Sequence, residues 1–113
     1  MEQHAVIVQF DYAADSLDPL HDLEEQLEAA IAEAGVGEFD GNEIAVDLLD
    51  GSLYMYGPDA DALFAVARPL LAGADCLRNV RATLRYGPPE DGVRERVVPF
   101  DPESGASGDE AGL

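Results

Sequence analysis

Apolar residues recur along this chain with two different periods, and the order of these periods is the feature that most constrains the fold. Residues 5–12 alternate apolar and polar side chains, as a half-buried strand does. Residues 19–34 place their leucines at helical spacing, after an Asp18-Pro19 pair suited to a helix start and before Gly35, which is suited to end it. The chain therefore begins with a strand followed by a helix.

The next segment predicts a hairpin. Residues 43–49 and 52–56 are expected to be strands around Asp50-Gly51, because Asp-Gly between apolar runs is a strong two-residue turn signal. Such a turn sets the register, so that Leu48 would pair with Leu53 and Val46 with Met55. Gly41-Asn42 is expected to form a separate turn before the hairpin.

The second half of the chain predicts a helix followed by two strands. Asp59 is expected to cap a second helix, whose apolar stripe runs from Leu63 to Ala74. Residues 77–86 alternate again and predict a strand, with Val80, Ala82, Leu84 and Tyr86 facing inward. Residues 93–98, closed by Pro99, predict an edge strand.

The order β-α-β-β-α-β predicts an α+β fold, a ferredoxin-like βαββαβ sandwich with an additional C-terminal edge strand. Right-handed crossovers would place both helices on one face, with sheet order 4-1-3-2 and the extra strand beside the fourth. The alternative is an α+β sandwich with another strand order. We expect residues 1–100 to form a single domain and residues 101–113, rich in Gly, Ser, Asp and Glu, to form a disordered acidic tail.

The net charge and hydropathy of the chain argue against nucleic-acid and membrane partners. The 113 residues carry a formal net charge of −18, with no lysine and six arginines, so nucleic acid is not an expected partner. No apolar run approaches the length of a membrane span, and no basic residue precedes the first apolar stretch, so we expect a cytoplasmic protein without a membrane partner. Salt adaptation, codon bias and a basic partner would each explain the acidity.

The charge is also unevenly distributed. Residues 1–67 contain sixteen carboxylates and no arginine or lysine, whereas residues 78–96 contain five of the six arginines. The outer face of the first helix is expected to be acidic without any basic partner, and it includes Asp22, Glu25 and Glu28.

Few residues suggest catalysis or metal binding. His4 and His21 are the only histidines and are not expected to converge, and the lone Cys76 is interpreted as a buried structural thiol. The Asp, Gly and Asn of residues 40–43 are explained by turn chemistry rather than by a calcium loop. We therefore expect no catalytic residues, no metal and no cofactor.

Three segments, DGNE at 40–43, YMYGPDAD at 54–61 and LRYGPP at 84–89, resemble those of small uncharacterised bacterial proteins of ferredoxin-like type. The resemblance covers about residues 5–98. It implies a bacterial, soluble, stand-alone domain and attaches no activity, because this fold hosts many unrelated functions.

The sheet face without helices is the predicted binding surface. Tyrosine and arginine are enriched at protein interfaces, and arginine binds carboxylates in a bidentate manner. If Tyr86 pairs with Val93, then Arg94 and Arg96 join this face. By alternation, the face carries Gln9, Asp47, Tyr54, Tyr56, Arg81 and Arg85.

Three functions are consistent with these features. The first is a non-enzymatic binding or regulatory module that self-associates, as a homodimer, or binds another protein through the open sheet face. The second is an acidic inhibitor or immunity-type protein that covers a basic site with Asp22, Glu25 and Glu28. The third, which ranks last because no base of tunable pKa accompanies it, is a small-molecule enzyme using Tyr54 or Tyr56 as acid and Arg85 as anion clamp.

Overall fold

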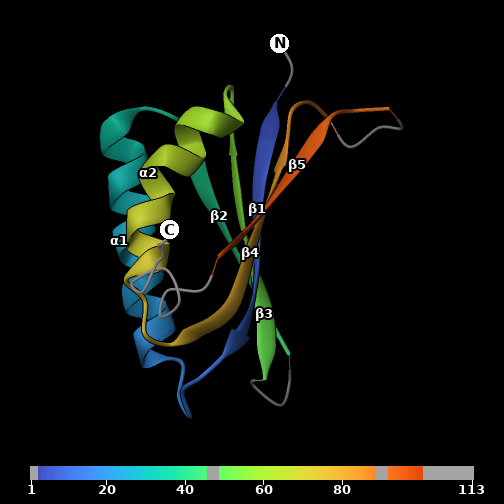
Figure 1. Ribbon diagram of the computed structural model, residues 1–113. Helices are drawn as coiled ribbons and strands as arrows, with labels where there is room; N and C mark the ends of the chain where they lie inside the picture. Colours follow the sequence, from blue (N-terminus) through green and yellow to red (C-terminus); the bar gives the residue numbers. More distant parts are fainter. Residues whose placement is uncertain (1–2, 46–48, 89–91, 101–113) are drawn as a thin grey trace, which may run out of the picture.

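The computed structural model describes residues 3–45, 49–88 and 92–100 (Figure 1). The predicted tail at 101–113 and the residues Val46, Asp47 and Leu48 lie outside this described part. The elements, in chain order, are β1 (His4–Tyr12), α1 (Asp18–Ala34), β2 (Glu38–Ile44), β3 (Asp50–Gly57), α2 (Ala60–Ala72), β4 (Leu77–Arg85) and β5 (Glu95–Phe100).

The strands form one antiparallel sheet of five strands, in the order β2-β3-β1-β4-β5. Both helices pack on the same side of this sheet and leave the other side uncovered (Figure 1). The predicted α+β class is therefore confirmed. No helix in the described ranges is long and apolar enough to cross a membrane.

The core lies between the helices and one face of the sheet, as strand alternation predicts. Every second residue of β1 is buried, and Val80, Ala82 and Leu84 of β4 are buried beside it. A register shift opposite residues 9–11 of β1 accompanies the positive φ of Asn79 (52°), so Leu77 is buried as well as Val80. The helices contribute Leu20, Leu23, Leu27, Ile31, Leu63, Phe64, Ala67 and Leu71.

The helix ends agree with the predictions in two of three cases. Gly35 adopts the left-handed conformation (φ 68°) and closes α1, and the Asp59 carboxylate accepts hydrogen bonds from the first-turn N–H groups of α2. The predicted cap at Asp18 is wrong. Asp18 is the first residue of the helix itself, so the N-cap position falls on Leu17. The side chain of Leu17 cannot accept a hydrogen bond, and α1 has no side-chain cap.

The predicted hairpin turn at Asp50-Gly51 is wrong. Both residues belong to β3, Gly51 lacks the positive φ that a two-residue turn of this type needs, and Leu53 pairs with Asn42 rather than with Leu48. The Ala45 N–H closes the hairpin by donating to the Asp50 carbonyl at 3.0 Å. The turn predicted at Gly41-Asn42 is also wrong, because these residues lie within β2.

The expected pairing of the last two strands differs by one residue. The Tyr86 N–H donates to the Arg94 carbonyl at 2.9 Å, and Leu84 pairs with Arg96. A shift of one residue moves every side chain of a strand to the opposite face. Arg94 and Arg96 therefore lie on the helix side of the sheet, and their predicted place on the open face is wrong.

Candidate functional site

The uncovered face of the sheet presents side chains in rows that cross all five strands. Opposite residues on antiparallel strands point to the same side, so the pairings define each row. One row runs Glu38, Tyr56, Ala5, Arg85, Glu95. The middle row runs Gly41, Tyr54, Ile7, Thr83, Val97, and the third runs Glu43, Ser52, Gln9, Arg81, Pro99.

The middle row is an apolar band across the open face. Ile7 on the central strand is half-buried, although no helix covers it, and Tyr54 is its pairing partner on β3. At the edge strand, Val97 is 57 % exposed, which is high for a large apolar side chain. The row is interrupted by the hydroxyl-bearing Thr83, but Tyr54, Ile7 and Val97 leave apolar surface uncovered, and such surface is enriched at sites of contact.

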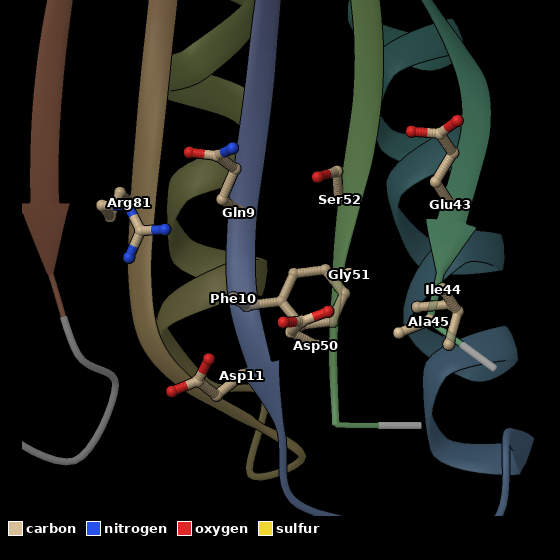
Figure 2. Close-up of a pocket in the computed structure, with 10 residues that line it drawn as sticks. All are labelled: Gln9, Phe10, Asp11, Glu43, Ile44, Ala45, Asp50, Gly51, Ser52 and Arg81. Carbon is tan, nitrogen blue, oxygen red and sulfur yellow. The ribbon is translucent and has the colours of Figure 1, made fainter. Parts of the chain in front are cut away.

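Charges on this face separate by sign on the two sides of β1. Carboxylates lie on the β2–β3 side, where Glu43 and Asp50 are exposed, while Arg81 and Arg85 lie on β4. Figure 2 looks onto this face with the helices behind the sheet, and it shows Arg81 and Glu43 on opposite sides of Gln9 and Ser52. The open face therefore has an acidic half on β2 and β3 and an arginine half on β4, with Glu95 of β5 beside Arg85 and Asp11 of β1 between the two halves.

A shallow hollow of about 520 Å³ occupies the lower part of this face (Figure 2). Among the described residues that line it, three are carboxylates, Asp11, Glu43 and Asp50, and one is a cation, Arg81. The hollow is open and polar rather than an enclosed apolar pocket, which favours a wet contact over a small-molecule site. The lining residues are Gln9, Phe10, Asp11, Glu43, Ile44, Ala45, Asp50, Gly51, Ser52 and Arg81.

Several polar side chains of the open face already make hydrogen bonds within the protein. The Tyr54 hydroxyl donates a 2.6 Å hydrogen bond to Glu43 Oε1, and this bond to a carboxylate raises the pKa of Tyr54 above its ordinary value. Arg85 Nε donates to the Gly87 carbonyl at 2.8 Å, which orients its guanidinium at the end of β4. Arg81 makes a longer 3.4 Å contact from Nη1 to the Asn79 carbonyl.

The structure brings most of the predicted face residues together. Gln9, Tyr54, Tyr56, Arg81 and Arg85 all lie in the three rows, as alternation predicts. Asp47 lies outside the described residues. The acidic residues of the alternative site are exposed on α1, in the other layer of the molecule, and these are Asp22, Glu25 and Glu28.

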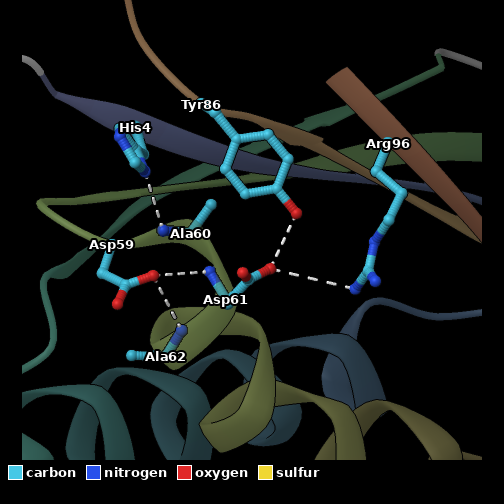
Figure 3. Close-up of polar contacts among 7 residues, drawn as sticks. All are labelled: His4, Asp59, Ala60, Asp61, Ala62, Tyr86 and Arg96. Carbon is cyan, nitrogen blue, oxygen red and sulfur yellow. Dashed lines mark hydrogen bonds and ion pairs between the residues drawn. The ribbon is translucent and has the colours of Figure 1, made fainter. Parts of the chain in front are cut away.

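A second polar cluster, which the sequence did not suggest, surrounds the N-terminus of α2 (Figure 3). His4 belongs to β1, and its Nδ1 accepts a 3.0 Å hydrogen bond from the backbone N–H of Ala60. Asp59 Oδ1 accepts from the N–H groups of Asp61 and Ala62 at 3.0 and 3.3 Å. Together these two side chains satisfy three N–H groups at the start of the helix.

Aromatic and charged contacts complete this cluster. The Tyr86 hydroxyl donates to Asp61 Oδ1 at 2.7 Å, which raises the pKa of Tyr86, and the Tyr86 ring meets His4 edge to face at 5.7 Å. Arg94 lies over the Tyr86 ring at 4.9 Å, and Arg96 Nη2 is 3.9 Å from Asp61. The cluster links the ends of β4 and β5 to α2, and the observed register of these two strands is what places Arg94 and Arg96 in it.

Among the described residues, no group of three or more His, Cys, Asp or Glu side chains is arranged to hold a metal ion. Cys76 is buried, and burial raises the pKa of its thiol. A raised pKa lowers the fraction of reactive thiolate, in keeping with a structural residue.

No protein-family model, curated protein or solved structure matches this chain. Function is therefore argued below from the residues of the chain itself.

Proposed function

We propose that this protein is a non-enzymatic binding module that makes a protein–protein contact through its open sheet face. The observation that carries this proposal is the apolar band formed by Tyr54, Ile7, Thr83 and Val97 on a face that no helix covers. Burying such a band against a partner is favourable in proportion to the apolar area removed from water.

The residue types around the band support a protein partner. Tyr54 and Tyr56 lie on one side of the central strand, and Arg81 and Arg85 lie on the other. Tyrosine and arginine carry much of the binding energy in protein interfaces, because each combines a large apolar surface with polar atoms. The acidic and arginine halves of the face add charge complementarity, which orients a partner.

The same contacts weigh against an enzyme at this face. A tyrosine that acts as an acid needs a lowered pKa, whereas the bond to Glu43 raises that of Tyr54. The hollow beside Arg81 is open to solvent, and its three carboxylates, Asp11, Glu43 and Asp50, would repel an anionic substrate. A binding function needs neither a tuned acid nor an enclosed site.

We also propose that the sandwich is of the ferredoxin-like type, extended by β5. The run β4-β1-β3-β2 within the sheet and the packing of both helices on one face support this proposal. In such a sandwich the helices protect one face and leave the other to solvent or to a partner.

Site-specific photo-crosslinking in the native host tests the proposed contact. A photoreactive benzoyl-phenylalanine replaces Val97 on the open face in one variant and replaces Glu25 on α1 in a matched variant. We expect a covalent protein adduct from position 97 and none from position 25.

The opposite pattern has a definite meaning. An adduct from position 25 alone would overturn the open-face contact and support an acidic inhibitor that acts through Asp22, Glu25 and Glu28. Absence of protein adducts from position 97 at several expression levels would also contradict the proposal.

A further inference from the structure

We propose that the partner of the open face is a second copy of this chain, packed face to face about a two-fold axis that runs parallel to β1. This inference rests on the proposed contact through the open face and adds the identity and orientation of the partner. It is derived from the positions of the charged residues in the three rows.

Consider two sheets stacked face to face, with the two-fold axis between them and parallel to β1. The rotation reverses the order of the strands in the second copy. It leaves each row at the same height along the strands, so each row faces the same row of the other copy. The central strands then meet, with Ile7 of one copy against Ile7 of the other. β3 of each copy lies over β4 of the other, so Tyr54 meets Thr83 across the interface. The apolar bands of the two copies therefore coincide along their whole length.

This orientation brings opposite charges together. Arg81 of one copy lies over Ser52 of the other, one strand away from Glu43 in the same row. Arg85 likewise lies over Tyr56, one strand away from Glu38. In that row Glu95 of one copy lies over Glu38 of the other, so each Arg85 lies next to a facing pair of glutamates and offsets their repulsion. Neighbouring strands are about 4.8 Å apart, a distance that arginine and glutamate side chains span. Each charge contact occurs twice, because the interface is two-fold symmetric.

The other simple two-fold arrangement is disfavoured by the same residues. In this arrangement the axis runs perpendicular to the strands, along the row of Ile7. Each strand then lies over the same strand of the other copy, and the two outer rows face each other. Arg81 would then face Arg85, and Glu43 would face Glu38. Like charges opposed in an interface are unfavourable. The parallel axis opposes carboxylates at Glu38 with Glu95 and at Asp11 with Asp11, but only the perpendicular axis also opposes the arginines, so the positions of Arg81 and Arg85 favour the parallel axis.

The size of the face suits a modest dimer. Five strands about 4.8 Å apart and about 8 residues long, at about 3.3 Å per residue, give a flat area of roughly 600 Å². A standard specific interface buries about 800 Å² on each partner, counted as accessible surface, which exceeds flat area. The open face is therefore large enough to hold two copies together without help from the helices.

Charge exchange tests the dimer and its axis together. Sedimentation equilibrium gives the dimer dissociation constant of the wild type, of Arg81→Glu, of Glu43→Arg and of the double variant. We expect each single substitution to weaken the dimer by about tenfold or more, in line with the loss of an interfacial charge contact. The double variant should recover most of that loss, because the swapped charges again face each other.

Two controls make the changes interpretable. Arg68→Glu on α2 and Glu25→Arg on α1 change the net charge by the same amounts on the helix layer. Neither control should change the dissociation constant by more than about threefold. Circular dichroism checks that every variant is folded, since all the substituted side chains are exposed.

The outcomes separate this inference from the proposed function. A wild type that stays monomeric at all concentrations overturns the second copy, whereas an adduct with a different protein at position 97 would still support the open-face contact. Single substitutions that strengthen the dimer would overturn the parallel axis. About the perpendicular axis, Arg81 and Glu43 each face a like charge, so replacing either residue by one of opposite charge would relieve repulsion.

A second measurement tests the axis without changing charges on the acidic or arginine half. About the parallel axis Gln9 meets Gln9 of the other copy, whereas about the perpendicular axis it lies over Ala5. A short bismaleimide should therefore join two copies of Gln9→Cys in a Cys76→Ala background. Failure to join them under conditions in which the dimer forms would contradict the parallel axis.

Discussion

Glu43 of β2 accepts a 2.6 Å hydrogen bond from the hydroxyl of Tyr54 on β3, and this bond joins the acidic edge of the open face to its apolar band. Gly41, which has no side chain, is the residue opposite Tyr54, so the tyrosine ring leans along β2 to reach Glu43. The pair thus orients one half of the proposed interface before any partner binds.

The Tyr54–Glu43 bond should be visible in the pH dependence of stability. The pKa of Tyr54 is raised in the folded protein, so the bond contributes fully below the ordinary value of 10.0 and is lost as pH rises through the raised pKa. We expect Tyr54→Phe to lower the free energy of unfolding by less than about 1 kcal/mol near pH 7, because the pair is exposed. Urea unfolding from pH 7 to 11 should show this difference shrinking above pH 10. A difference that persists or grows in that range would contradict the bond.

The cap of α2 supplies a matched pair of substitutions. Asp59 accepts two backbone N–H groups, whereas Asp18, at the start of α1, caps nothing. Asp59→Ala should lower the free energy of unfolding by about 1 kcal/mol. Asp18→Ala should change it by less than about 0.5 kcal/mol. Equal losses in urea titrations of the two variants would show that the assigned cap is wrong.

Two glycine backbones approach closely where β3 ends beside the start of β2. A Cβ on Gly57 would lie 2.2 Å from the Val36 carbonyl oxygen, so the backbone would have to move. Gly57→Ala should cost about 1–3 kcal/mol, the range typical of overpacking. Gly73 has a negative φ and its nearest such contact is 3.5 Å, so Gly73→Ala should leave stability unchanged or raise it by up to about 1 kcal/mol. Thermal unfolding of both variants measures the contrast, and a neutral Gly57→Ala would contradict the close approach.

Salt should strengthen the proposed dimer. Each chain carries a formal charge of −18, so two copies repel each other over a distance set by the Debye length, which falls from about 30 Å at 0.01 M salt to about 8 Å at 0.15 M. Contacts inside the interface, such as that between Arg81 and Glu43, are screened much less. Sedimentation at the two salt concentrations should give tighter association at 0.15 M, and tighter association at 0.01 M would contradict this balance.

Local side-chain patterns were sufficient to predict the central part of the fold. The strict alternation of β1 places Val6 and Val8 in the core and Gln9 on the open face, and burial of one face leaves no freedom of register. The leucines of α1 and the cap at Asp59 are equally local features, and the structure confirms them.

The hairpin of β2 and β3 could not be predicted in the same way. The pairing slips at Asp40, which breaks the alternation that would otherwise reveal β2. Asn42 then faces the helices and donates a hydrogen bond to Glu24 of α1, so a polar residue occupies a position where the pattern requires an apolar one. With β2 not recognised, Gly41-Asn42 was interpreted as a turn and Asp50-Gly51 as the turn of the hairpin, although both pairs lie within strands.

The cluster around α2 depended on a long-range register. Tyr86 points toward α2 by the alternation of β4, but Arg94 and Arg96 join the cluster only because Tyr86 pairs with Arg94 rather than with Val93. The Gly-Pro-rich loop between β4 and β5 gives no turn type that would fix this pairing. His4 contacts Ala60, which is 56 residues distant in sequence, and no local pattern encodes such a contact.

The most direct test of the central claim is a dilution series followed by two-dimensional amide NMR. Self-association through the open face predicts concentration-dependent shifts at residues in the three rows, above all Ile7, Thr83 and Val97, with the outer residues of α1 unchanged. Shifts confined to α1, or no shifts from micromolar to millimolar protein, would contradict the claim that two copies meet at this face.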